Sequence, residues 1–532
     1  MFKKIMIGIV IVVVIIAAGG FIVVKSIIKS MDQVVMQVDN EKISAYKREL
    51  DFSKYEESLA GIDEKRIVEL ESYIVEKSIE SVRANLLNGN LTCEEIVLFY
   101  VNRIKENDGN YNAVIQLNPN ALEYARNIDN KIENGQGLGK LDGVVVLIKD
   151  NVASKDMNTA SGAYALKDLE TTRDAFIVEA LIENGAIILG KANLSEWSNF
   201  MSSPSSSGFS VLGGQTKNAY GKYDVGGSSA GSSVAASLNY STVTIGSETA
   251  GSLIFPAGQN SVVALKPTMG LLSRDLIVPI SEAQDTAGVI ARSVGDLRII
   301  FKVMIRKDEN DQATTIIDSF DLTSLDTTLD SVSLEGKKLG FVDNGSIELK
   351  QIVEEFRSLG AEVVEVKFDD SVSEIDMLTV LSFGIKNDVN AFLSNDAVRS
   401  DMKNLSQIVA FNKEDESRMP FGQTYLQSGL DSQVTHAEYE KIVSNNRMIS
   451  RTAIDKVLQE NKIEAIISIS NELSGIYAPA GYPALTIPSG FRDSGEPYGV
   501  TIIGSKNTDG ALIELGYGYE VNTNHRKIPV LK

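Results

Sequence analysis

The chain has 532 residues, of which 43% are apolar and 23% are charged, a composition typical of a large globular protein and not of a disordered or collagen-like one. Its 71 acidic and 51 basic residues give a formal charge of -20, which argues against a broad surface for nucleic acid. With one cysteine and two histidines, the chain has no disulfide framework, no cysteine-rich metal site and few partners for a histidine-based active site.

The first predicted element is an uncharged apolar helix at residues 5–24, with two lysines close to each end. At about 1.5 Å per residue, such a helix is about 30 Å long, which matches the hydrocarbon core of a bilayer. We therefore expect residues 1–30 to form a single membrane anchor, with the remainder of the chain on the extracytoplasmic side. A cleaved signal peptide is the alternative, because small residues at 17–20 could host a cleavage site, and the protein would then be secreted.

Beyond this segment the composition and apolar pattern of the sequence change twice. Residues 31–75 are polar and charged, with helical tendencies and no apolar strand, so they are predicted to form a helical stalk. From residue 76 onward, short apolar runs such as 144–148 and 186–189 alternate with amphipathic helices such as 175–184. This alternation predicts one large α/β domain over residues 76–532, with a central mixed sheet flanked by helices.

Two motifs of known chemistry are incomplete. Residues 185–192 nearly match a phosphate-binding loop, but they lack its Ser or Thr and are predicted to be a strand. Residues 227–231 match the G-x-S-x-G pattern of α/β-hydrolases with Ser229 at the centre, yet loop residues precede them where an apolar strand is required. No spacing typical of metal ligands or nucleotide phosphates is present, so we expect no metal and no cofactor.

Three other segments carry residues suited to chemistry without histidine. Lys149 closes an apolar strand, where poor solvation lowers the pKa of an amine and lets it act as a base. Ser228 lies in a run of Gly and Ser, which allows close backbone approach and proton relay. Ser252 follows Ala250 and Gly251 in a loop whose amides can point at a developing oxyanion. Together these segments offer a base, a relay and a nucleophile.

This constellation resembles the amidase signature family, serine hydrolases with a Ser-cisSer-Lys triad. The resemblance extends over roughly residues 76–528. The matching blocks are residues 91–95, 111–115, 190–197, 266–274, 284–288, 480–488 and 499–504. The resemblance implies that Ser252 is the acylated nucleophile, that Ser228 is a bridging serine reached through a cis peptide bond from Gly227, and that Lys149 is a neutral base.

The resemblance also implies an oxyanion hole from the amides of Thr249, Ala250 and Gly251, with Ser229 supporting the triad. Two positions depart from the usual family pattern. Ala250 stands where glycine is usual, which is a minor change if the backbone there needs no positive φ. Ile254 stands where arginine is often found, and an apolar residue at that position is typical of the subgroup that includes peptide amidases.

The expected activity is hydrolysis of a small or peptide amide through an acyl-enzyme on Ser252. Two alternatives stay open: a catalytically inactive, membrane-tethered binding protein on the same scaffold, and a glutaminase subunit of a transamidosome. The variable region, about residues 300–475, is expected to shape the substrate pocket and carries no readable motif. Cys93 is expected to be buried near a helix start.

Overall fold

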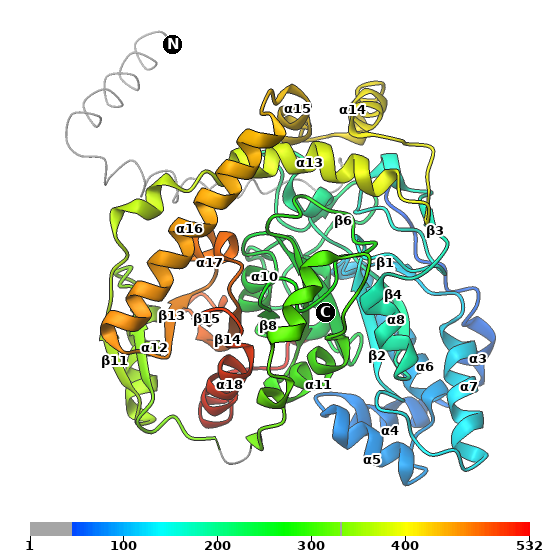
Figure 1. Ribbon diagram of the computed structural model, residues 1–532. Helices are drawn as coiled ribbons and strands as arrows, with labels where there is room; N and C mark the ends of the chain where they lie inside the picture. Colours follow the sequence, from blue (N-terminus) through cyan, green and yellow to red (C-terminus); the bar gives the residue numbers. More distant parts are fainter. Residues whose placement is uncertain (1–44, 330–331, 532) are drawn as a thin grey trace. The chain divides into compact units, whose positions relative to one another are not determined.

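The computed structural model describes residues 45–329 and 332–531 of the chain (Figure 1). The predicted membrane anchor at residues 5–24 lies outside this part of the chain. Within the described residues, the structure contains no helix that combines the length and the apolar character needed to cross a bilayer.

A mixed β-sheet forms the centre of the described domain (Figure 1). Its eleven strands there are β1 (Val114–Leu117), β2 (Val145–Lys149), β4 (Ile187–Ala192), β7 (Val243–Glu248), β8 (Val263–Lys266), β9 (Thr286–Ala291), β10 (Lys338–Phe341), β11 (Glu362–Glu365), β13 (Ala465–Ile469), β14 (Ala484–Phe491) and β15 (Pro497–Ile503). Their spatial order is β1-β4-β2-β7-β9-β8-β14-β15-β13-β10-β11. β2 is parallel to β4 and β7, β10 is parallel to β13 and β11, and the other pairs are antiparallel. The mixed sheet confirms the predicted α/β class.

Helices and short strands surround this sheet. The helices are α3 (Glu56–Gly61), α4 (Glu64–Ile74), α5 (Ile79–Leu87), α6 (Cys93–Asn107), α7 (Ala121–Glu133), α8 (Phe176–Glu183), α9 (Ala230–Ser237), α10 (Ile254–Gln259), α11 (Val294–Met304), α12 (Ile347–Ser358), α13 (Met377–Leu393), α14 (Leu405–Lys413), α15 (Thr424–Asp431), α16 (His436–Asn461), α17 (Ser474–Ala480) and α18 (Asp509–Thr523). The short strands β3 (Glu170–Thr171) and β12 (Val398–Arg399) pair with each other, as do β5 (Phe209–Ser210) and β6 (Gly214–Gln215).

The sheet has a hydrophobic core on each face. Every residue of β2 is buried. Val146 and Ile148 pack in the core that includes α8 and α11, whereas Val145 and Leu147 pack in the core that includes α6 and α9. Successive side chains of a strand point to opposite faces, so a strand covered on both faces must be apolar throughout. This explains the unbroken apolar run from which the strand was predicted.

Part of the predicted stalk at 31–75 packs on the domain. Its described residues include α3 and α4, as the helical tendencies predict, and Tyr55, Leu70 and Ile74 are buried in the same core as α6. Residues 45–75 accordingly belong to the same compact unit as the rest of the described domain. The described part of the predicted stalk therefore packs on the domain, because α3 and α4 carry a few well-spaced apolar residues within an otherwise polar sequence.

The incomplete motifs adopt the local structures predicted for them. Residues 187–192 of the phosphate-loop look-alike form strand β4. The residues before Ser229 form a loop, and α9 begins directly after it. Cys93 is fully buried at the start of α6, behind the capping residue Thr92.

One residue near the C-terminus joins distant parts of the domain. The guanidinium of Arg526 donates hydrogen bonds to the carboxylate of Glu76 at 2.7 Å and to the backbone carbonyls of Ser237 and Ser261 at 3.0 and 2.7 Å. Because Ser237 is the last residue of α9, this contact ties the C-terminal end of that helix to the chain's own tail.

Candidate active site

The site lies where two parallel strands end. β2 ends at Lys149 and β7 ends at Glu248, and the carboxyl ends of parallel neighbours meet at the same edge of a sheet, where ligands commonly bind in α/β folds. The fully buried Nζ of Lys149 lies 2.9 Å from Oγ of Ser247 and 3.2 Å from its carbonyl oxygen.

The Gly/Ser-rich loop before α9 approaches the same lysine. Nζ of Lys149 donates a hydrogen bond to Oγ of Ser228 at 2.7 Å, and the peptide bond from Gly227 to Ser228 is cis. A Cβ at Gly227 would lie 2.4 Å from Oγ of Ser195, so only glycine allows this close approach. The structure thus brings Lys149 and Ser228 together as the resemblance implies.

Ser252 lies in the turn between β7 and α10 and is 8% exposed. Its carbonyl oxygen accepts a hydrogen bond from the amide of Ser229 at 3.1 Å, which joins the two serine-bearing loops. The carboxylate of Glu248 accepts the amides of Leu253 at 2.8 Å and Ile254 at 3.2 Å. These hydrogen bonds of buried polar groups fix the shape of the turn. The backbone at Ser252 is therefore positioned by Ser229 and Glu248.

The two residues before Ser252 explain one departure from the family pattern. Gly251 has a φ of +83°, and a Cβ there would lie 2.7 Å from the side-chain nitrogen of Asn471. Ala250 is not among the described residues with positive φ. Alanine is therefore acceptable at position 250, whereas glycine is required at position 251.

The electrostatic state of Lys149 follows from its burial. Desolvation lowers the pKa of its amine to about 7, although the carboxylates of Asp285 and Glu248 act in the opposite direction. Burial also lowers the pKa of Lys191 and Lys266 to about 8. Each of those two amines donates to at least one backbone carbonyl. Lys149 differs from them because its partners include two serine hydroxyls.

Sequence reasoning missed three residues of this site. The first two are Asn151 and Ser247: Nδ2 of Asn151 donates to Oγ of Ser247 at 3.0 Å, and the same Oγ accepts from Nζ of Lys149. The third is Asp285. The carboxylate of Asp285 accepts the hydroxyl of Thr249 at 2.5 Å and the backbone amides at positions 280 and 281. All three lie within or beside the segments singled out from the sequence, and that proximity was the available signal.

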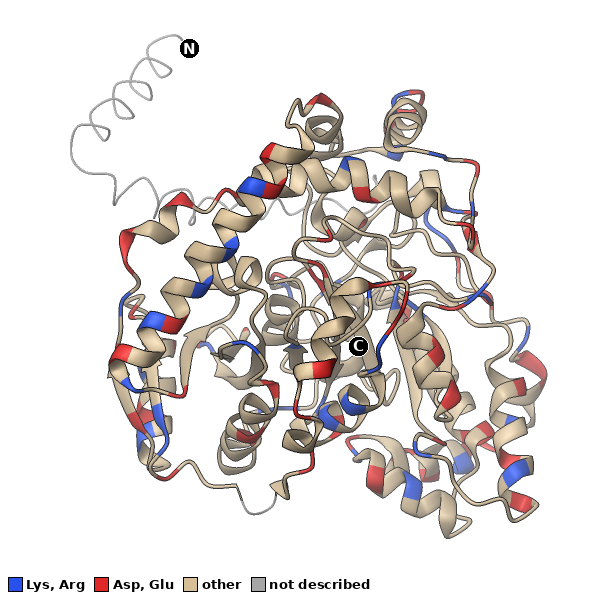
Figure 2. Cartoon of the chain, viewed as in Figure 1, with Lys and Arg blue, Asp and Glu red and all other residues tan. Residues whose placement is uncertain are grey.

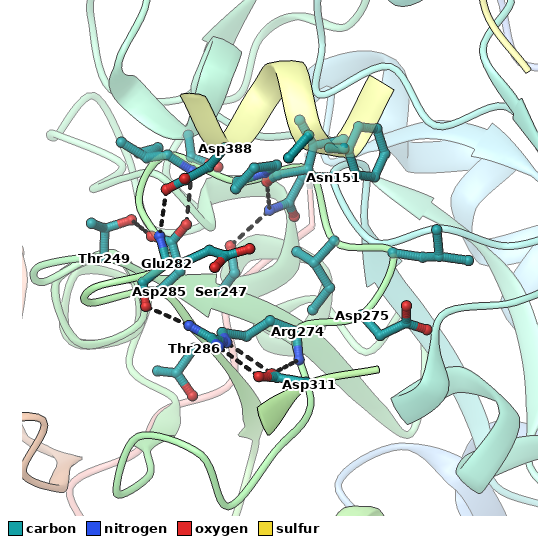
Figure 3. A pocket seen from close by; sticks show the side chains of 18 of the residues that line it. Asn151, Ser247, Thr249, Arg274, Asp275, Glu282, Asp285, Thr286, Asp311 and Asp388 are labelled. Atoms are coloured by element: carbon teal, nitrogen blue, oxygen red, sulfur yellow. Dashed lines mark hydrogen bonds and ion pairs between the residues drawn. The ribbon is translucent and has the colours of Figure 1, made fainter. Parts of the chain in front are cut away.

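A cavity of about 330 Å³ lies at the carboxyl end of β7 (Figure 3). Lys149, Ser228 and Ser252 do not line it themselves, but three residues from the β7 end of the loop that carries Ser252 do. Its wall includes Asn151, Ser247, Glu248 and Thr249 from the site itself, together with residues 274–280 and the side of α13 that carries Asp388. Ser229, predicted to support the triad, donates from its hydroxyl to the carbonyl of Ser247 at 3.0 Å. The arrangement therefore combines a low-pKa amine, bonded serines and an adjacent space for a ligand.

Known proteins similar to this chain carry the same fold. The Amidase family pattern matches residues 95–513. A protein of Arabidopsis thaliana named a probable amidase is 35% identical over 477 residues, which cover 86% of this chain and 92% of that protein. The crystal structure of an amidase family protein from Bacillus anthracis matches with a TM-score of 0.86 at 34% identity, covering 93% of this chain and 98% of the other. Native peptide amidase from Stenotrophomonas maltophilia matches with a TM-score of 0.81 at 34% identity, covering 86% and 99%. With the family pattern matched over most of its length, this chain belongs to the amidase signature family.

Proposed function

We propose that the protein hydrolyses carboxylic amides through an acyl-enzyme on Ser252. The observation that carries this proposal is the 2.7 Å hydrogen bond between the buried Nζ of Lys149 and Oγ of Ser228, in a site where the pKa of the lysine is lowered to about 7. A neutral amine at this position is a base of suitable strength for a reaction near neutral pH.

In the first half of the reaction, Oγ of Ser252 forms a bond to the amide carbonyl carbon. Its proton passes through the hydroxyl of Ser228 to Nζ of Lys149. The oxyanion is stabilised by the amides of Thr249, Ala250 and Gly251. Among the described residues, no hydrogen-bond acceptor occupies the amides of Ala250 and Gly251, which leaves them available.

In the second half, the proton returns through Ser228 to the leaving nitrogen as the C–N bond breaks, because an unprotonated amine anion leaves poorly. Water then attacks the ester carbon and gives a proton to Lys149; as the bond from that carbon to Oγ of Ser252 breaks, the proton returns through Ser228 to this Oγ and the carboxylic acid is released. The likeness to a peptide amidase and the apolar Ile254 favour a small or peptide amide as substrate.

The test is covalent labelling of the serine. We expect intact-mass analysis after fluorophosphonate treatment to show one adduct on the wild-type protein and none on the Ser252→Ala variant. The Ser229→Ala variant should still carry an adduct at Ser252, which separates this mechanism from one centred on the G-x-S-x-G serine. A folded wild-type protein without any adduct would favour the alternative of an inactive binding scaffold.

The pH dependence of activity follows from the state of Lys149. Because the neutral amine is the reactive form and its pKa is about 7, kcat/KM for a neutral amide should fall about tenfold per pH unit below 7 and level off above it. The measurement is a profile of kcat/KM from pH 5.5 to 9 on one uncharged substrate. A flat profile across this range would contradict the assignment of Lys149 as base.

We also propose that residues 1–30 anchor the catalytic domain to a membrane on its extracytoplasmic side. The uncharged stretch at residues 5–24 supports this proposal. Mass analysis of the mature protein extracted from membranes tests it, because a cleaved signal would remove this segment and release the domain.

A further inference from the structure

The cavity lined by Ser247, Glu248 and Thr249 is strongly acidic. Six acidic side chains and one basic side chain line it: Glu248, Asp275, Glu282, Asp285, Asp311, Asp388 and Arg274. In Figure 2, acidic and basic residues are interspersed along the long outer helix α16, whereas the cavity wall has one basic side chain for six acidic ones. The charge of this wall therefore requires its own explanation.

Only part of that charge is neutralised within the protein. Asp311 forms an ion pair with Arg274 at 2.5 Å, and Asp275 forms one with Arg173. Across the residues that the structure describes, Asp285 and Asp388 have no ion-pair partner. The positive charge of Arg274 acts to lower the pKa of both Asp285 and Asp388, but its guanidinium is already bonded to Asp311 and to the carbonyl of Glu282.

Asp388 is the more available of these two carboxylates. Asp285 is occupied by the hydroxyl of Thr249 and by two backbone amides. Asp388 projects from α13 and accepts one hydrogen bond through Oδ2, from the amide of Glu282 at 2.8 Å. Burial, followed by the negative charges of Glu282 and Asp285, raises its pKa to about 7. A cation bound beside Asp388 would offset the repulsion between its carboxylate and the negative charges of Glu282 and Asp285.

A second, independent observation at the cavity points to a hydrogen-bond donor as ligand. Asn151 is only 2% exposed and lines the cavity, and its Oδ1 has no hydrogen-bond partner among the described residues. Nδ2 of Asn151 donates to the hydroxyl of Ser247 at 3.0 Å and to the carbonyl oxygen of Val278 at 3.4 Å, and because a carbonyl can only accept, the Val278 contact favours this amide orientation. A buried acceptor without a donor is costly, so a ligand that brings an N–H would satisfy it.

Part of the remaining wall of the cavity is apolar. The backbone segment at residues 276–280 contributes Leu, Ile, Val, Pro and Ile, and Ala391 and Phe392 contribute from α13. A ligand that fits this wall has an aliphatic stem that packs on the apolar residues and a positively charged end that reaches the carboxylates.

We propose that this cavity is a specificity subsite, in which Asp388 with Asp285 binds a protonated amine or guanidinium of the amide substrate. The inference deepens the proposed function and rests on it, since Glu248 and Thr249 of the cavity wall belong to the same turn as Ser252. The cation can come from a basic side chain or from the free α-amine of an amino-acid amide, and two pairs of compounds separate these sources.

The experiment first measures binding to the Ser252→Ala variant, which cannot turn the compounds over. N-acetyl-lysinamide is compared with N-acetyl-norleucinamide for a side-chain cation, and leucinamide with N-acetyl-leucinamide for an α-amine. In at least one pair, the cationic compound should bind at least tenfold more tightly. The Asp388→Asn change, made in the same background, should reduce that ratio to about twofold or less. Asp401→Asn, which removes an exposed acidic group outside the cavity wall, should retain the ratio.

The wild-type enzyme then gives kcat/KM for the same compounds. A preference for the cationic member in binding, without hydrolysis of any compound, would overturn the proposed hydrolysis of these amides and support the subsite. Hydrolysis without a cation preference in either pair would overturn the subsite and support the proposed function. If Asp388→Asn does not fold, Glu282→Gln serves as the second variant, and loss of this neighbouring negative charge should reduce the ratio. A ratio that stays unchanged in Glu282→Gln would overturn the subsite, and so would equal binding of all four compounds to the Ser252→Ala variant.

Discussion

The Lys149→Met variant is expected to lose about 10⁴-fold in kcat/KM while it keeps its fold, because a base that acts together with its serines contributes on this scale. Methionine has a similar length, so it fills the buried space of the lysine without leaving a large cavity. The hydroxyl of Ser228 then loses its 2.7 Å donor and its route for the proton. Single-turnover hydrolysis of a neutral amide measures the loss, and circular dichroism with thermal melting checks the fold.

Lys191→Met is the matched control for this variant. Lys191 is also fully buried near the carboxyl end of a parallel strand, β4, directly beside β2. Its amine donates to the carbonyl of Val152 and to the hydroxyl of Thr159, and not to a serine of the site. If both variants lost activity equally, the loss would reflect the burial of an amine in this sheet and the assignment of Lys149 as base would be wrong.

The second large effect is expected for Ser228→Ala, which should lower kcat by about 10³-fold with KM changed by less than about threefold. Ser228 is completely buried and is proposed to carry the proton of the nucleophile, so its removal acts on the transition state and not on ground-state binding. Steady-state kinetics with one amide substrate separate the two parameters.

Ser229→Ala provides the comparison, since the hydroxyl of Ser229 donates to the carbonyl of Ser247, whereas Nζ of Lys149 bonds to Ser228 and Ser247. We expect it to cost about tenfold through a small displacement of the loop. A loss in Ser229→Ala as large as that in Ser228→Ala would show that the loop as a whole matters and would remove the special role of Ser228.

The sequence predicts those parts of the site that are specified over short stretches of chain. Lys149 is recognisable because an apolar run ends at it, and Ser228 because glycine and serine surround it. The structure places these two residues in contact, and the catalytic roles given to them and to Ser252 are predictions that the variants above test. The fold class is predicted for the same reason, because unbroken apolar strands between amphipathic helices indicate a sheet covered on both faces.

The acidic cavity and the N-terminal packing could not be predicted in this way. Asp285 and Asp388 are about 100 residues apart in sequence and meet only because α13 packs against the loop at residues 280–285. Tyr55, Leu70 and Ile74 are isolated apolar residues in a polar segment, and nothing local shows which surface they bury against. In both cases the decisive contacts are tertiary, and short-range periodicity contains no information on them.

The contact of Arg526 with α9 bears on when the enzyme can first act. The ribosome delivers the chain from its N-terminus, so the carbonyl of Ser237 is synthesised 289 residues before the arginine that bonds to it. Until that arginine emerges, the helix that follows Ser228 lacks one of its restraints, and Glu76 lacks its counter-ion. Completion of the Gly/Ser-rich loop and its helix is thereby tied to completion of the polypeptide, so the serines are synthesised well before their surroundings are complete.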